Sequence, residues 1–452
     1  MTQTTQPSRP FGLLHVVLFP AYLLERSSGR QRFFLLLLYV LIAIPILLLG
    51  WREARLMEIP RVGDPFDVRK YTAREVADER NAFVFYRRAS EKMKALQPTS
   101  AGLASASATP RPATPRTNRA QPDMSQWLDD NREALELWLI ATQCPDALDV
   151  KPADLRIDTQ MTILQQLREF ARLAKLEADR LEAEGDMAGA YRMHQGTLRS
   201  SRHATLSGPL IAHLVGVNLH GQAAGAIENW ADDARTSTSL LRTALEDAKA
   251  FQRTWVPNSF SFQQEYVTAM NLMNDPKEAA KLEDEALRGD QQLADFLPMG
   301  AKGTRWLLHE PERSRRLYRL WATNWLAYCD LPRDERPGQT GTAALSQFKP
   351  GQHPPRDAHL MPPEELERQV RKAPLARQIL PAVSQCLNAM DRERLRHDGL
   401  VVTLAELLYR REKGSPPKTL GDLVGTYLDE LPPEFGPMDP PLTVVPTSET
   451  QP

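Results

Sequence analysis

Nineteen consecutive residues, from Phe33 to Trp51, carry no charge and are almost all apolar. A helix rises about 1.5 Å per residue, so a helix of this length spans roughly 28 Å, close to the hydrocarbon thickness of a bilayer. Pro45 lies inside the run, and helices in lipid tolerate proline. The pattern therefore predicts one transmembrane helix over residues 33–51.

A second apolar run, Phe11–Leu24, is shorter and is interrupted by Pro20. It is too short to span a bilayer, so we expect an N-terminal tail (residues 1–32) whose apolar segment lies in the membrane interface. Three arginines lie close to each end of the predicted span, so basic residues do not set its orientation. No small-residue cleavage site follows the apolar core, which indicates an uncleaved anchor. A short tail before a long domain favours a cytoplasmic N-terminus and an extracytoplasmic C-terminal domain.

After the span, apolar residues recur at steps of three and four, the period of an amphipathic helix. The pattern predicts a juxtamembrane helical segment (52–96, with a helix over Ala73–Leu96), a helical domain (123–330) and C-terminal helices (364–414). Within the helical domain, LEAEGDMAGAYRMHQGTL indicates a glycine turn between two paired helices, which is typical of tetratricopeptide-like hairpins. The full repeat pattern is absent. The sequence thus predicts a mainly α fold, in which antiparallel helical hairpins form an ectodomain behind the anchor.

Proline-rich stretches separate these helical parts. Residues 97–122 are mostly Ala, Pro, Ser and Thr with three arginines and no acid, so they cannot bury enough apolar surface to become ordered. We expect a disordered linker there. Residues 331–363 predict a loop rich in proline and glycine, and residues 415–452 predict a short helix followed by an extended tail.

Charge and cysteine content exclude several classes of function. The formal net charge is −1, and no run of five or more basic residues occurs, so nucleic acid is not an expected partner. Three scattered cysteines, Cys144, Cys329 and Cys386, are too few for a disulfide framework or a paired-cysteine metal site, and at most one pair could bridge. No phosphate-binding, dinucleotide-binding or hydrolase motif occurs. The sequence identifies no cofactor, metal or small-molecule substrate and argues against an enzyme.

The C-terminal stretch LAELLYRREKGSPPKTLGDLVGTYLDELPPEFG resembles an element that follows the stem helix of G-type major pseudopilins of type II secretion. It also resembles the end of a group of uncharacterised single-pass membrane proteins of planctomycete bacteria. The upstream stretches NAFVFYRRA and RLWATNWLAYCDLP are similar to that second group, as is the order of anchor, helical domain and tail.

The resemblance implies an anchored protein of the bacterial envelope, in the inner membrane, and carries no established activity. Pro416 and Pro417 replace an aromatic-proline pair of the pseudopilin element, and PPEFGPM stands where the loop that binds calcium in some pseudopilins would follow. Calcium binding is therefore not carried over. The anchor also lacks the prepilin-peptidase site, so a filament subunit is not expected.

Two histidines on one predicted helix, His213 and His220, share a face. They are seven residues apart, or about 10.5 Å along a helix, so one metal ion cannot bind both. His194 and His203 on the preceding helix could complete two separate metal sites only if packing brought them close. We expect core or interface histidines instead.

An aromatic stripe follows four arginines near the end of the helical domain. It consists of Tyr318, Trp321, Trp325 and Tyr328, at helical spacings of three, four and three. On a surface, such a stripe could stack on sugars while the arginines bind anions. Inside a domain it would be the buried face of a helix. Exposure of the two indoles distinguishes the two interpretations.

The leading hypothesis is a membrane-anchored envelope protein that acts without catalysis as an interaction or scaffold protein, with another envelope protein as its partner. The hairpin architecture, the linkers and the missing catalytic motifs motivate it. One alternative is a binding module for a cell-wall glycan or peptide that uses the aromatic stripe. The other is a hydrolase with a site assembled across helices, which a pocket with a carboxylate beside His213 or His220 would favour.

Overall fold

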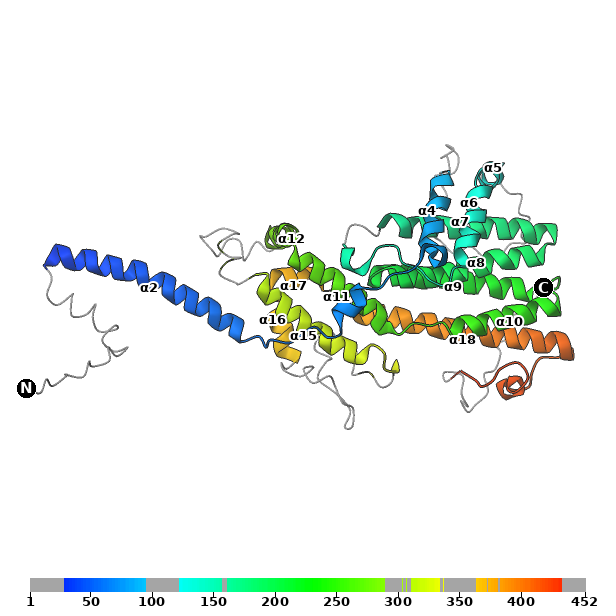
Figure 1. The fold of residues 1–452 in the computed structure, drawn as a ribbon. Coiled ribbons are helices and arrows are strands. Elements are labelled where there is room, and N and C mark those ends of the chain that lie inside the picture. Colours follow the sequence, from blue (N-terminus) through cyan, green and yellow to red (C-terminus); the bar gives the residue numbers. More distant parts are fainter. Residues whose placement is uncertain are drawn as a thin grey trace, which may run out of the picture.

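The fold is described from a computed structural model, which covers residues 28–94, 122–156, 161–288, 303, 306, 310–333, 336, 363–371, 373–380 and 383–432. The described residues are mainly helical and contain no β-strand, only two isolated bridges. The predicted mainly α fold is confirmed (Figure 1). The predicted interfacial segment, most of the linker, most of the loop and the end of the tail lie outside the described residues.

Helix α2 (Gly29–Met57) contains the predicted span and continues past it. None of its apolar window is buried against the rest of the chain. Figure 1 shows α2 projecting away from the other helices. Within the described ranges, α2 is the one helix that is long and apolar enough to cross a membrane.

The segment after α2 contains less helix than the sequence predicts. A helix over Ala73–Leu96 is wrong in its first half, because a short helix α3 (Val68–Thr72) ends early and α4 (Ala82–Lys92) begins only at Ala82. The side chain of Asn81 accepts a hydrogen bond from the Phe83 amide at 3.2 Å and donates one to the Leu148 carbonyl at 2.9 Å. Asn81 therefore caps α4 and also ties it to a distant loop.

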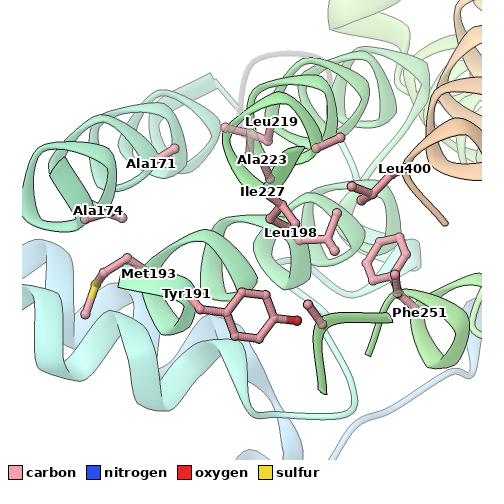
Figure 2. Close-up of a cluster of buried hydrophobic side chains, with 14 of the residues drawn as sticks. Ala171, Ala174, Tyr191, Met193, Leu198, Leu219, Ala223, Ile227, Phe251 and Leu400 are labelled. Atoms are coloured by element: carbon pink, nitrogen blue, oxygen red, sulfur yellow. The ribbon is translucent and has the colours of Figure 1, made fainter. Parts of the chain in front are cut away.

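The larger hydrophobic core, here called the distal core, lies farthest from α2. Its helices include α4, α6 (Arg132–Thr142), α7 (Met161–Glu184), α8 (Met187–Ser207), α9 (Leu210–Asp232) and α10 (Thr238–Gln252). Leu198, Leu219 and Ile227 from α8 and α9 meet in its centre, beside Phe251 of α10 and Leu400 of a later helix (Figure 2).

Small residues allow the distal helices to approach closely. A Cβ atom on Gly216 of α9 would lie 2.7 Å from the Ser201 carbonyl oxygen of α8. Likewise, a Cβ on Gly196 would lie 2.8 Å from the Trp138 ring. Helices α7 and α8 are joined at Gly185, whose φ of 89° lies in the left-handed region that favours glycine. The packing of α8 against α6 and α9, and its turn from α7, therefore depend on glycine.

A second core, here called the proximal core, lies next to the end of α2. It combines Ile59 and Val62 with helices α11 (Asn258–Asn274), α12 (Pro276–Arg288), α15 (Glu312–Tyr328), α16 (Pro363–Arg371) and α17 (Pro374–Ile379). Its parts are far apart in the sequence and lie together in Figure 1. The predicted segments 123–330 and 364–414 therefore each contribute to both cores.

Helix α18 (Val383–Lys413) connects the two cores. Its first residues, such as Leu387 and Met390, pack in the proximal core, whereas Leu400 and Leu404 pack in the distal core. After Gly414, whose φ is 72°, the chain turns back.

The described part of the predicted tail packs against the distal core. Tyr427 and Leu428 are both only 3% exposed, and the Tyr427 hydroxyl donates a hydrogen bond to Glu412 at 2.8 Å. Residues up to 432 therefore belong to the folded domain.

Candidate functional site

The aromatic stripe on α15 is buried in the proximal core. Tyr318, Trp321, Trp325 and Tyr328 are 0%, 2%, 7% and 1% exposed. Tyr318 stacks on Tyr266 of α11 at 6.1 Å between ring centres and lies 5.1 Å from the Trp321 ring. Neither indole presents a face on which a sugar could stack. Of the two interpretations, burial supports the buried helix face and not the sugar-binding surface, because the rings pack inside the proximal core against α11.

Arginines that precede the stripe hold the end of α2 instead of a ligand. Arg316 is only 5% exposed, and its Nη1 donates to the Leu56 carbonyl at 3.0 Å and to the Ile59 carbonyl at 3.5 Å. Its Nε donates to Glu312 at 3.0 Å. The last carbonyls of a helix lack partners within the helix and carry its negative dipole end, so a buried guanidinium stabilises them.

Asp64 adds a second contact between this segment and the proximal core. It accepts hydrogen bonds from the Tyr266 hydroxyl at 2.5 Å and from Arg319 at 3.1 Å. Burial, followed by the bond to Asp64, raises the pKa of Tyr266 well above its ordinary value, so the phenol stays a donor at neutral pH. The chain from Leu56 to Asp64 is thus fixed to α11 and α15.

Buried polar side chains lie where the two cores meet, on α9, α11 and α18. This group, here called the histidine seam, consists of His213, His220, Ser261, Glu393 and His397, each at most 4% exposed. His213 connects the three helices: its Nδ1 lies 2.8 Å from the Ser261 hydroxyl and its Nε2 lies 3.4 Å from Glu393.

The second half of the seam has a defined pattern of protons. His397 Nε2 lies 2.9 Å from the Ala248 carbonyl, which can only accept, so this nitrogen carries the hydrogen. Burial lowers the pKa of His397 to about 4, so the ring is neutral and its Nδ1 accepts from His220 Nε2 at 3.0 Å. Burial and the neighbouring His397 lower the pKa of His220 to about 3, which leaves its Nδ1 as a buried acceptor without a partner in the described residues.

The seam contains groups that could act in catalysis, but its geometry favours a structural role. Ser261, His213 and Glu393 form a chain like that of a serine hydrolase, yet Ser261 is 0% exposed. A cavity of about 500 Å³ reaches His220 and Glu393, and Ser261 is not part of its lining. No cluster of three metal-binding side chains occurs in the described parts of the chain.

Sequence reasoning identified one side of the seam. The shared face of His213 and His220 is visible in the sequence. Their partners Ser261, Glu393 and His397 lie about 50 to 180 residues later in the chain, so only the fold pairs them. One feature of the sequence could have pointed to these partners: Glu393 lies four residues before His397, on the apolar face of α18.

No known protein family, curated protein or solved structure matches this chain. The resemblance to planctomycete membrane proteins and to the pseudopilin element therefore stays a prediction.

Proposed function

We propose that this protein is a single-pass, membrane-anchored interaction protein of the bacterial envelope, which holds its helical domain in a fixed position at the membrane surface. The observation that carries the proposal is the junction between α2 and the proximal core. Ile59 is 1% exposed in that core, and Arg316 binds the carbonyls at the end of α2. An anchor that only tethers a domain needs no such junction.

Side chains around the end of the apolar helix support a membrane boundary there. Arg52 and Arg55 lie 5.1 Å and 5.2 Å over the rings of Trp306 and Trp51, and both indoles are partly exposed. Tryptophan and arginine are typical of the interface between lipid and water. The N-terminus is proposed to be cytoplasmic and the helical domain extracytoplasmic.

The cavity that reaches His220 and Glu393 does place a carboxylate beside a histidine, but its lining holds no serine, threonine or cysteine, and Ser261 is 0% exposed outside it, which favours interaction over catalysis. The one array that resembles a hydrolase is enclosed, and its three polar groups satisfy one another. Buried polar groups of this kind fix how helices pack. We therefore assign binding of another envelope protein to the domain surface or to the chain after Pro432.

Affinity purification from gently solubilised native membranes tests this function. The full chain is compared with a chain that ends at Pro432, followed by mass spectrometry. Ending the chain at Gly414 would be a poor test, because it removes Tyr427 and Leu428 from the distal core. We expect a partner that the full chain retains; loss with the shorter chain assigns contact to the tail. If neither chain enriches a protein above the untagged control, the interaction hypothesis is wrong.

Orientation is tested separately with a thiol reagent that cannot cross membranes. Thr426 is exposed near the C-terminal end of the folded domain, so Thr426→Cys provides a labelling site. Cys329 and Cys386 are buried, and Cys144 is partly exposed, so Cys144→Ser provides a clean background. Labelling in intact spheroplasts is the expected result; labelling only after lysis would contradict the proposed orientation.

A further inference from the structure

A cavity of about 280 Å³ opens beside the distal core, between the end of α6 and helices α8 and α10. Its volume suits a small molecule or the end of a peptide chain. Its polar lining includes Arg199 and Arg202 of α8, Asp247 of α10, and Gln143, Gln195 and Thr254. The side chain of Phe251 supplies an apolar wall.

Two guanidinium groups in this lining have no carboxylate partner among the described residues. Arg202 donates to two backbone carbonyls, of Pro145 at 3.0 Å and of Thr254 at 3.4 Å. Arg199 donates to the side-chain oxygen of Gln143. All three acceptors are neutral, so neither guanidinium forms a salt bridge with a carboxylate of the described residues.

Partial burial makes this arrangement unfavourable in the empty protein. Burial, as the largest effect, lowers the pKa of Arg202, although Asp146 opposes the shift. Partly buried charges in proteins are normally paired, because removal from water disfavours the charged form. An anion in the cavity would supply the missing partner, and guanidinium groups bind carboxylates and phosphates with two parallel hydrogen bonds.

Asp247 limits which anions fit. Its Oδ2 accepts from the Tyr191 hydroxyl at 3.0 Å and from Gln195 at 2.5 Å, so two neutral donors hold it away from pairing with the arginines. Two arginines and one aspartate give the lining a net charge of +1. A ligand with one negative charge balances that lining, whereas a second negative charge would meet Asp247.

We propose that this cavity is a binding site for a small monoanionic ligand or chain end, with a carboxylate or a singly charged phosphate group held by Arg199 and Arg202 and a hydrogen-bond donor facing Asp247. The other large cavities offer less. In the cavity beside His220, Arg396 already pairs with Glu228 at 2.7 Å. The cavity beside Trp255 is lined by two carboxylates, Asp330 and Asp398, and by one arginine, Arg394, so its charge disfavours an anion.

The test uses the full chain in lipid nanodiscs at pH 6, where inorganic phosphate carries mainly one negative charge, with acetate and inorganic phosphate as probes and sodium chloride at matched ionic strength as the reference. Binding only to the folded state raises the melting temperature with probe concentration. We expect at least one probe to raise it at millimolar concentration; the probe that acts identifies carboxylate or phosphate as the recognised group. Citrate, with its additional charges, is expected to act more weakly than acetate.

Variants locate the site. Arg199→Gln should weaken binding about tenfold, the usual effect of losing one charged hydrogen-bond donor. The matched control is Arg192→Gln, which removes an exposed arginine from the same helix and should leave binding unchanged. Asp247→Asn should strengthen binding by removal of a negative charge. The proposal is overturned if neither probe acts, or if Arg199→Gln and Arg192→Gln bind equally well. Because the cavity is remote from α2, either of these results would leave the proposal that α2 anchors the domain unaffected.

Discussion

The distal and proximal cores are built in different ways from the same kind of element. The distal core joins helices that mostly follow one another, α7, α8 and α9, through short turns and close contacts at glycine. The proximal core joins segments that are far apart, such as Ile59 and α15, and it encloses the charged groups of Arg313 and Arg316.

The distal core is therefore stabilised mainly by contacts between helices that are neighbours in the sequence, and the proximal core by contacts between distant segments. Contacts between neighbouring helices form with little loss of chain entropy, whereas closing a loop of some 250 residues costs more. The proximal core also depends on hydrogen bonds from buried arginines to the end of α2. We infer that the distal core is the more independent unit, and that the proximal core couples the domain to α2.

The largest expected effect tests the independence of the distal core. Trp138 of α6 is 0% exposed and stacks on Phe170 at 6.3 Å. Trp138→Ala should destabilise this core by about 3–5 kcal/mol, because it removes a large buried ring and leaves a cavity. Hydrogen exchange measured by mass spectrometry should show faster exchange in α6, α7 and α8.

A matched change on the same helix serves as control. Ile140 is 51% exposed, so Ile140→Ala should alter stability by less than about 0.5 kcal/mol. Peptides from α11 and α15 should keep their wild-type exchange in Trp138→Ala. If they exchange faster by the same factor as α7, the two cores unfold as one unit and the comparison fails.

A smaller effect is expected from breaking the junction with the anchor. Arg316→Met keeps the length of the side chain but removes the guanidinium donor from the Leu56 and Ile59 carbonyls, of which Leu56 retains the Ile59 amide at 3.3 Å. The expected cost is about 2–3 kcal/mol, the usual effect of leaving buried polar groups unpaired. Exchange should accelerate in α15 and at the end of α2, and stay unchanged in α7 and α8.

Arg315→Met is the control for this junction. Arg315 precedes Arg316 and binds Glu312, Met273 and Asn274 at 3.2 Å, 3.4 Å and 3.3 Å, away from the end of α2 and from a more exposed position. It should cost less than about 1 kcal/mol. Equal effects of the two variants would show that Arg316 has no special role at the end of α2.

The sequence predicted elements well and their partners poorly. The apolar run 33–51, the helical character of the domain and the turn at Gly185 are local features, and periodicity or glycine chemistry reveals them. The start of α4 was missed because Asn81 gains its role from the distant Leu148 carbonyl. Periodicity marks an apolar face without saying which helix covers it.

The candidate site shows the same limit. The stripe on α15 has the composition of a sugar-binding surface and the position of a core helix, and burial alone decides between them. His213 and His220 were recognised as core or interface residues, but Ser261, Glu393 and His397 become their partners only when α9, α11 and α18 pack together.

Acidification should affect the two cores in opposite directions. In the distal core, burial lowers the pKa of His203 to about 4, below its ordinary value, so the unfolded state binds the proton first as pH falls. From pH 7 to about pH 5 this should cost about 2 kcal/mol. In the proximal core, burial raises the pKa of Glu265 to about 7, so the folded state binds the proton first and gains stability over the same range.

Hydrogen exchange at the two pH values, corrected for intrinsic rates, tests this opposition. Peptides of α8 should lose protection at pH 5, and peptides of α11 should gain it. His203→Gln should reduce the first response, to which the buried His220 and His397 also contribute, and Glu265→Gln should remove the second. Tyr86→Phe retains the buried histidine and should leave the direction of the first response unchanged. Loss of protection in both cores would refute the assignment of the second response to Glu265.

The smallest effect tests the local turns on which the distal core depends. Gly185 has a φ of 89°, and a Cβ there would meet nothing within 4 Å, so Gly185→Ala introduces backbone strain alone, about 1 kcal/mol. Gly221 lies inside α9 and also has open space around it, so Gly221→Ala should stabilise the helix by about 0.5–1 kcal/mol. Chemical unfolding of both variants, with exchange to locate the change, should give opposite signs within the same core. A stabilising Gly185→Ala would mean that the turn between α7 and α8 does not require a left-handed residue, and the local origin of the distal core would lose its clearest support.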